Sequence, residues 1–576
     1  RIPRPISGEN PVTGITGTQY TGTVSWTPAP PSTFQYGTVY TAVLTLQAAP
    51  GYTFAGIGQN AFSHEDAPGA VTNPAGGATV RITFPPAASA TYSVITSFGP
   101  VERESSALAL MRAKKADNGL TIDLPGDTEP VDPNSVILVA GDNSPAKVII
   151  NGHGQELTIG GQGTLLTVGS GVTLTLRNIT LSGIQGNDAP LIMVRRGGKL
   201  VLGDGVILTD NETTADAGGV WVNGGELVLN PGAEITGMAA QRGGGVLVDT
   251  YGTLFMNGGI IAGNTASGVN GGGGVLLLSG GTFTMVDGTI QSNRVLEESS
   301  GGGVLVIGGP YDMSFNMFGG TIQYNRAEDK NSGGGVLVIG VLDIDGKYNM
   351  SFNMFGGTIQ YNRAMAGSSG GGVGILVDWG IFNLYDGAIR GNNALGAESG
   401  GGVFINASYY GGFYFYMYGG TIGGEGGEAN TASSGGGNGV CVLDGAFIMS
   451  GGTITGNGSG GYGVLCRSDN SYGYSGFTMS GPARIDEDVF LTCEYYPPLV
   501  IIIGGDLSAP SPVANIIVDP PPVSGTPFGT PFGTPLMKAS SSELIQRNYQ
   551  KFQFNGSTLS DIDIDYDGWR YCGYYK

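Results

Sequence analysis

Two short glycine-rich markers recur along the middle of the chain, and no other feature constrains the fold as strongly. The first is Gly-Gly-Gly-Val and the second is Gly-Gly-Thr-Ile, each with close variants. Successive copies of the second marker lie 26 to 37 residues apart. A β-solenoid accepts insertions at its corners while its strands stay in register. The strand sequences therefore stay similar from repeat to repeat, while the number of residues between them varies. We therefore expect a parallel β-helix over residues 120–505.

Composition agrees with many short strands joined by tight turns. Glycine supplies 106 of 576 residues, 40% of the chain is hydrophobic and 12% is charged. Long helices are excluded as the main element because each interior glycine costs about 1 kcal/mol. The apolar content is too high for a disordered tail. A propeller would need about four strands in each blade, whereas these repeats carry two or three.

Side chains at fixed offsets from each marker isoleucine predict columns along the solenoid. Seven residues before it stands a phenylalanine in most coils, and coils about 4.8 Å apart would stack these rings in the core. Three residues after it, an asparagine should take the left-handed conformation at a corner and bond the next coil's backbone. The glycine triplets should form another corner at positive φ. The two predicted columns are Phe283, Phe315, Phe352, Phe382, Phe415 and Phe447, and Asn264, Asn293, Asn325, Asn362, Asn392 and Asn457.

The segments on either side of the repeats complete an all-β chain. Residues 1–86 contain three runs that alternate with period two, which predicts an immunoglobulin-like β-sandwich. Residues 87–119 read as a linker and a capping helix over 100–117, before an Asn-Gly stop. Residues 506–576 read as a β tail that closes the solenoid. An end cap is expected because the last coil of an open stack exposes unpaired backbone.

Three sequence stretches resemble a known group of proteins. These are 148–154 (Val-Ile-Ile-Asn-Gly-His-Gly), 165–183 and the recurrent Phe-x-Met-x-Gly-Gly-Thr-Ile-x-x-Asn. They look like bacterial, glycine-rich, right-handed parallel β-helix surface proteins with the pectate-lyase-like fold, similar to autotransporter passengers and polymorphic outer-membrane proteins. The resemblance implies a right-handed coil and an extracellular or cell-surface location, with a signal peptide removed before Arg1. It specifies fold better than function.

Charge and cysteine content restrict the partners and the chemistry. The net charge of −20 and the lack of a basic run argue against nucleic acid, and no apolar run is long enough to span a membrane. Cys441 and Cys466 stand at offsets that place them on opposite strand faces, and Cys493 and Cys572 complete the set. No pair has the spacing of a zinc or redox motif. Free buried thiols and one disulfide both remain open.

Two apolar strips are expected on the outside of the solenoid. Strands such as Val-Leu-Val-Ile at 304–307 are apolar at both parities, as in a strand buried on two sides. Four residues before the marker isoleucine, an aromatic side chain should point outward. Such a patch exceeds what monomers usually expose, so the N-terminal module, the tail or another copy should cover it. The predicted aromatic strip is Phe318, Phe355, Tyr385 and Tyr418, flanked by Tyr416.

Two polar features are candidate ligand sites. Arg294, Arg326 and Arg363 stand at one offset on successive coils, and they predict either an ion-pair network with nearby acids or a stripe for an acidic glycan. Asp563, Asp565 and Asp567 match the start of a calcium loop, although an acidic strand face explains the same alternation. We expect no cofactor.

Catalysis is not expected, because the acids do not cluster. Asp249, Asp378 and Asp444 share no offset, and Asp287 and Asp386 share one but lie three coils apart. That separation, about 14 Å, is too long for a pair of hydrolytic carboxylates. The resulting hypothesis is a non-catalytic extracellular structural protein that self-associates into a filament or layer. An adhesin for glycan or a host protein is the second reading, and a polysaccharide lyase or hydrolase is the third.

Overall fold

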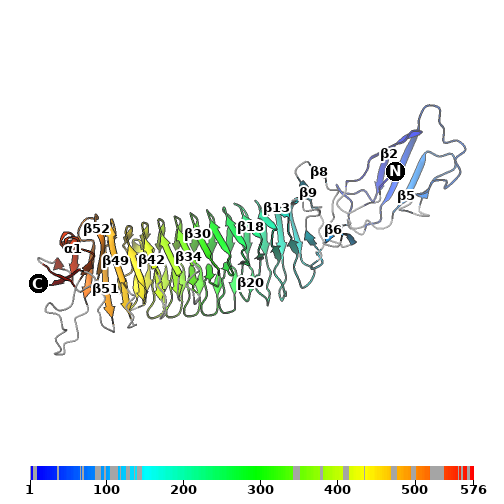
Figure 1. The fold of residues 1–576 in the computed structure, drawn as a ribbon. Coiled ribbons are helices and arrows are strands. Elements are labelled where there is room, and N and C mark those ends of the chain that lie inside the picture. The colour runs from blue at the N-terminus through cyan, green and yellow to red at the C-terminus, as the bar shows by residue number, and fades with distance from the viewer. Residues whose placement is uncertain are drawn as a thin grey trace.

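The computed structural model describes most of the chain. It leaves out residues 1, 4, 6–9, 36–37, 65–66, 68–70, 85–91, 97–98, 104–113, 117–118, 125–129, 135, 139–145, 310, 341–349, 377–379, 407–413, 434, 469–475, 494–500, 519–536, 555–556, 559–561, 567–570 and 576. The described residues form a long β-solenoid with an antiparallel sheet at its N-terminal side (Figure 1). The predicted parallel β-helix is therefore confirmed as a stack of parallel coils.

Each coil contributes strands to as many as three sheets. Sheet I takes one strand from each coil and has 16 strands in all. Its pairing is parallel from β10 to β55, and only β56 is antiparallel. Its strands are β10 (Val136–Leu138), β12 (Leu166–Val168), β14 (Ile192–Arg195), β17 (Val220–Asn223), β21 (Val246–Asp249), β25 (Val275–Leu277), β29 (Val304–Ile307), β33 (Val336–Ile339), β37 (Val373–Leu376), β41 (Val403–Asn406), β45 (Gly437–Leu443), β48 (Tyr462–Ser468), β51 (Asp488–Cys493), β53 (Ala514–Val518), β55 (Phe552–Phe554) and β56 (Ser557–Thr558).

Sheet II follows sheet I along each coil and takes two strands from most coils. The marker Gly-Gly forms the bend between these two strands, and the marker isoleucine lies in the second. Its strands are β8 (Lys114–Ala116), β9 (Gly119–Asp123), β11 (Ala146–Thr158), β13 (Val172–Ser182), β15 (Lys199–Leu202), β16 (Val206–Thr209), β18 (Glu226–Leu229), β19 (Glu234–Thr236), β22 (Thr253–Met256), β23 (Ile260–Ala262), β26 (Thr282–Met285), β27 (Thr289–Gln291), β30 (Met313–Met317), β31 (Thr321–Gln323), β34 (Met350–Met354), β35 (Thr358–Gln360), β38 (Gly380–Leu384), β39 (Ala388–Arg390), β42 (Tyr414–Met417), β43 (Thr421–Ile422), β46 (Ala446–Met449), β47 (Thr453–Ile454), β49 (Gly476–Gly481), β50 (Arg484–Ile485), β52 (Ile501–Leu507), β54 (Met537–Ala539), β57 (Ile562–Tyr566) and β58 (Tyr571–Tyr575).

Sheet III is a narrow ribbon of seven two-residue strands after the asparagine corner. Its inward alanine and valine side chains, such as Ala266, Val295 and Ala327, form a small buried cluster of their own. Its outward positions hold the arginine stripe. The strands are β20 (Ala239–Ala240), β24 (Thr265–Ala266), β28 (Arg294–Val295), β32 (Arg326–Ala327), β36 (Arg363–Ala364), β40 (Asn393–Ala394) and β44 (Thr431–Ala432).

Stacked phenylalanines fill the core between sheets I and II. The rings from Phe283 to Phe447 lie nearly parallel, with neighbouring centroids 4.6 to 4.8 Å apart, and all are fully buried. Phe477 extends the column by one more coil, at 5.2 Å from Phe447. Burying each such side chain contributes roughly 1.5–3 kcal/mol. The spacing equals the separation of paired strands, so the register of the sheets imposes the stack.

The outer face of sheet I is covered by the chain itself. Leu276, Leu305 and Leu337 point away from the core, yet all are fully buried. The glycines that precede them bridge from coil to coil and pass directly over these side chains; a Cβ on Gly243 would lie 3.1 Å from that of Leu247. This apolar strip therefore needs no neighbouring molecule, and the expectation that it might is wrong.

The glycine triplets are required by close packing. Gly302 lies outside the positive-φ region, and a Cβ there would approach Gly334 O to 2.3 Å. The expected positive-φ corner is found at Gly243, whose φ is +65°, but not at the triplet that contains Gly302. Backbone from one coil passes so close to the next that only hydrogen fits at these positions, and that close approach lets the covering segment seal sheet I.

The N-terminal module forms one antiparallel sheet in the described residues, ordered β1-β2-β3-β5-β4, where a two-sheet sandwich was expected. Trp26, Phe34, Tyr40 and Phe84 pack on one of its faces. The strands are β1 (Gly14–Thr16), β2 (Tyr20–Thr27), β3 (Thr41–Ala48), β4 (Val71–Thr72) and β5 (Thr79–Thr83).

The predicted N-terminal capping helix over 100–117 is contradicted at both of its ends, and its middle, residues 104–113, lies outside the described residues. Both described parts of residues 100–117 are extended: β7 (Gly99–Arg103) pairs with β6 (Tyr92–Thr96), and β8 pairs with β9. Ala116 pairs with Gly119 and β8 runs antiparallel to β9, where the sequence predicted the stop of a helix. The antiparallel strand β8 then covers the first edge of sheet II.

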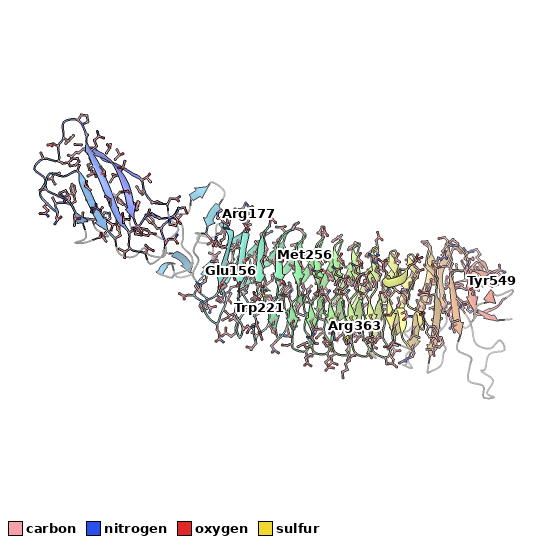
Figure 2. The ribbon with its side chains drawn as sticks, turned by 180° about the vertical axis from the view of Figure 1, so that it is seen from behind. Glu156, Arg177, Trp221, Met256, Arg363 and Tyr549 are labelled. Carbon is pink, nitrogen blue, oxygen red and sulfur yellow. The ribbon has the colours of Figure 1, made fainter. Side chains whose placement is uncertain are left out.

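A helix caps the C-terminal end, where none was predicted. Parallel pairing continues beyond residue 505, the predicted end of the solenoid, to β54 and β55. Helix α1 (Ser542–Asn548) then packs Leu544 and Ile545 against the last coil, and Ser541 caps its N-terminus. The short helix η2 (Tyr549–Lys551) follows, with Tyr549 at this end of the rod (Figure 2). The antiparallel strands β56 and β58 complete the closure.

Candidate functional site

An exposed column of aromatic rings runs along the corner of sheet II. Phe318, Phe355, Tyr385 and Tyr418 follow directly after β30, β34, β38 and β42 and are 52%, 39%, 41% and 45% exposed. Neighbouring ring centroids lie 4.8 to 4.9 Å apart, with planes within 10° of parallel. We call these four residues the aromatic column. No described part of the chain covers them.

Tyr416 and Tyr414 widen the column at its C-terminal end. Their rings lie 5.5 Å apart, and Tyr416 lies 5.9 Å from Tyr418. Burial, and then the neighbouring phenols, raise the pKa of Tyr416, and burial with Tyr385 raises that of Tyr418. These phenols therefore stay neutral to a higher pH than a free tyrosine, and the rings themselves carry no charge at neutral pH.

The stacking decides what the aromatic column can contact. Both faces of Phe355 and Tyr385 are occupied by their neighbours in the stack. Only ring edges and tips remain toward solvent. A sugar that binds an aromatic side chain normally lies on a ring face, which these internal rings do not offer. The aromatic column instead presents a row of apolar ring edges, with one ring from each coil.

Polar side chains beside the aromatic column bond to each other. Asn383 Nδ2 donates to Asn353 Oδ1 at 2.7 Å, and Asn353 Nδ2 donates to Asn316 Oδ1 at 2.8 Å. A second ladder connects the outward glutamines of β27, β31 and β35, each amide donating to the previous coil at 2.9 Å, and Arg390 ends it. The amide groups in these ladders are therefore already hydrogen-bonded and are less available to a polar ligand. The ladders also stiffen the face that carries the aromatic column.

The buried asparagine ladder is the internal counterpart. From Asn264 to Asn392, each Nδ2 donates both to the next Oδ1 and to a marker-isoleucine carbonyl, and the backbone N–H of the same asparagine donates to that Oδ1. Asn430 joins the ladder between Asn392 and Asn457, although its offset from Ile422 hid it. The left-handed conformation was expected at the asparagine itself. It is found at the residue before the asparagine, such as Tyr324, so this expectation is wrong.

Two of the three arginines in the predicted stripe share one carboxylate. Arg294 Nε and Arg326 Nε lie 2.6 and 2.7 Å from Glu328 Oε1. Burial would raise the pKa of Glu328, but hydrogen bonds from Arg326 and Arg294 outweigh it and hold that pKa below its ordinary value. Arg294 and Arg326 therefore belong to an ion-pair network, which was one of the two alternatives predicted for the stripe; the other was a site for an acidic glycan.

Arg363 ends the stripe midway along the rod (Figure 2). It pairs in register with Arg326 on one side and Asn393 on the other, and it is exposed. None of the described residues forms an ion pair with it. Nearby, Tyr324 and Tyr361 stack at 5.4 Å with φ values of +56° and +54°. Left-handed backbone is costly for so bulky a residue, and other coils hold glycine or serine at this corner.

The acids considered for catalysis or calcium remain separate. Asp287 and Asp386 each accept the backbone N–H of the following glycine, which is a local turn role. Asp378 and Asp567 lie outside the described residues, as do the side chains of Asp563 and Asp565 in β57. Among the described residues no group of histidine, cysteine, aspartate and glutamate is arranged to hold a metal ion.

Cys441 and Cys466 are free, buried thiols on opposite faces of sheet I. Cys441 lies in the outer cluster and Cys466 in the core, as their offsets predicted. Burial raises the pKa of Cys441 to about 12 and also raises that of Cys466. Neither is a candidate nucleophile. The side chains of Cys493 and Cys572 lie outside the described residues.

The described residues contain no helix that is both long and apolar enough to cross a membrane. Comparisons with protein-family models, with curated proteins and with solved structures found no match to this chain.

Proposed function

We propose that this protein is a rigid, non-catalytic structural rod that works outside the cell and self-associates side by side. The observation that carries the proposal is the aromatic column, which leaves four uncharged rings exposed on consecutive coils. Monomers rarely leave a continuous apolar strip open, so a partner surface should cover it. The extracellular placement is supported by the resemblance of the repeats to bacterial surface proteins.

The polar ladders favour a mechanical role. The outward asparagine and glutamine side chains form hydrogen bonds with the equivalent side chains of neighbouring coils, along the rod axis. Each ladder ties one coil to the next, so the face resists bending and offers few free donors to a soluble ligand. Together with the stacked phenylalanine core, this arrangement supports a spacer or layer element more than a binding pocket.

Light scattering coupled to size-exclusion chromatography tests the proposal. At micromolar concentration we expect dimers or larger species, and we expect more of them when NaCl rises from 20 to 300 mM. The reason is that two copies with a net charge of −20 each repel one another until salt screens them. A monodisperse monomer at both salt concentrations would contradict self-association.

Adhesion is the second candidate, and the tyrosine corner favours it. Tyr324 is 55% exposed and occupies a backbone conformation that the fold fills elsewhere with smaller residues. Strained backbone conformations of this kind cluster at functional sites. The variant Tyr324→Asn/Tyr361→Asn should fold normally, because asparagine tolerates the left-handed region. Glycan-array binding by the parent that this variant loses would support adhesion, and no binding by either would contradict it.

A further inference from the structure

We propose that the aromatic column packs against the same column of a second copy, with the two rods antiparallel. The inference rests on the proposed self-association and names the surface, the partner and the orientation. It follows from three properties of the face: its periodicity, its polarity on either side of the column and the order of residues along it. Asp386, exposed in the bend after Tyr385, adds a carboxylate at the edge of this face.

The periodicity points to a second copy as the occupant. The aromatic column is a series of ridges 4.8 to 4.9 Å apart over four coils. A partner surface with another repeat would fall out of step after a few ridges. A second β-solenoid has the same repeat, so its rings can stay in step with those of the first along the whole length, as identical side chains do between paired sheets in a steric zipper.

Polarity across the face favours the antiparallel arrangement. A two-fold axis perpendicular to the rods places asparagine opposite asparagine and ring opposite ring. A two-fold axis parallel to the rods exchanges left and right, so the asparagines of one copy face the glycine bend of the other. Only the first arrangement matches polar with polar and apolar with apolar, which an isologous interface requires.

The residue order along the column agrees. Phenylalanine occupies its first two coils and tyrosine its last two. In the antiparallel pair Phe355 meets Tyr385, and Asn316 meets Tyr416, so each tyrosine lies opposite a phenylalanine or an asparagine of the other copy. The parallel pair would instead crowd tyrosines against tyrosines at one end and leave only phenylalanines at the other.

Site-directed cross-linking tests the orientation. The background Cys493→Ser/Cys572→Ser leaves only Cys441 and Cys466, which are buried. Asn316→Cys and Tyr416→Cys are introduced separately, and both lie beside the column, which stays intact. Mild oxidation should link a mixture of the two variants and leave each variant alone unlinked. In an antiparallel pair, identical positions at this coil lie about 14 Å apart, beyond the reach of a disulfide.

The outcomes separate this inference from the proposed function. Phe318→Cys, at the end of the column, serves as the test for parallel rods, because Phe318 meets its own counterpart only in the parallel pair. Linkage of Phe318→Cys to itself would overturn the antiparallel orientation. Oligomers that form without linkage in any mixture would overturn the choice of face while self-association stands. Monomers under all conditions would overturn both. The variant Tyr324→Asn, which removes an exposed ring outside the face, should cross-link as the parent does in the same background.

Discussion

Asn457 donates its side-chain N–H to Glu487 Oε2 at 2.9 Å, and its backbone N–H bonds to the other carboxylate oxygen. Glu487 thus occupies the place of the next asparagine and ends the buried ladder. A carboxylate suits this place because it accepts from both donors and needs no further coil to satisfy a donor of its own.

The substitution Glu487→Ala should therefore loosen the C-terminal coils. Two donors of Asn457 lose their acceptors, and because Asn457 is half-buried each loss should cost less than the penalty of about 1–3 kcal/mol for a fully buried unpaired group. Because coils contact only their neighbours, the loss should stay local. Hydrogen exchange should accelerate in β47 and β50, while β22 to β27 keep their protection. Glu487→Gln retains one acceptor oxygen and should show a smaller effect. Uniform acceleration along the rod would contradict the local role.

Phe352 and Phe355 provide a matched pair of inward and outward rings. Phe352 is fully buried in the core column, and Phe355 is 39% exposed in the aromatic column. Phe352→Ala should lower the free energy of unfolding by about 3–5 kcal/mol, as expected for a large buried side chain. Phe355→Ala should cost less than about 1 kcal/mol in the monomer. Urea denaturation of both variants at low protein concentration measures the difference, and equal losses would contradict the assigned faces.

Glu328 makes the ion-pair network dependent on pH. Its pKa is lowered in the folded state, so the stability it adds is present above its unfolded pKa near 4.5 and is lost as pH falls through the folded value. Glu328→Gln should destabilise the protein at pH 7 by less than about 1 kcal/mol, because the arginines are exposed. At pH 3 the difference should shrink. Glu297→Gln serves as the control, and a difference that grows on acidification would refute the sign.

The buried thiols should report on unfolding. In the background Cys493→Ser/Cys572→Ser, a disulfide reagent at pH 8 should leave the folded protein unmodified, because Cys441 and Cys466 are both buried and their pKa values are raised. Both thiols should react once guanidinium unfolds the chain. Rapid modification of either one in the folded protein would contradict their burial.

The columns could be predicted from sequence because they depend only on spacing from the marker isoleucine. Asn430 escaped because residues inserted after Ile422, including η1 (Gly426–Glu428), displace it from the common offset. The segment that covers Leu305 could not be predicted, since it belongs to the same coil and folds back over sheet I. A helix was predicted at the N-terminal end and missed at the C-terminal end, because the Pro100 signal is local whereas the docking of α1 depends on the shape of the last coil.

Sedimentation equilibrium of Phe355→Asp beside Tyr324→Asn tests the central claim most directly. Phe355 lies at the centre of the aromatic column, and an aspartate there would place a charge in the contact between two copies. We expect the parent and Tyr324→Asn to associate alike and Phe355→Asp to associate at least tenfold more weakly. Equal association of all three proteins would contradict the role of the aromatic column.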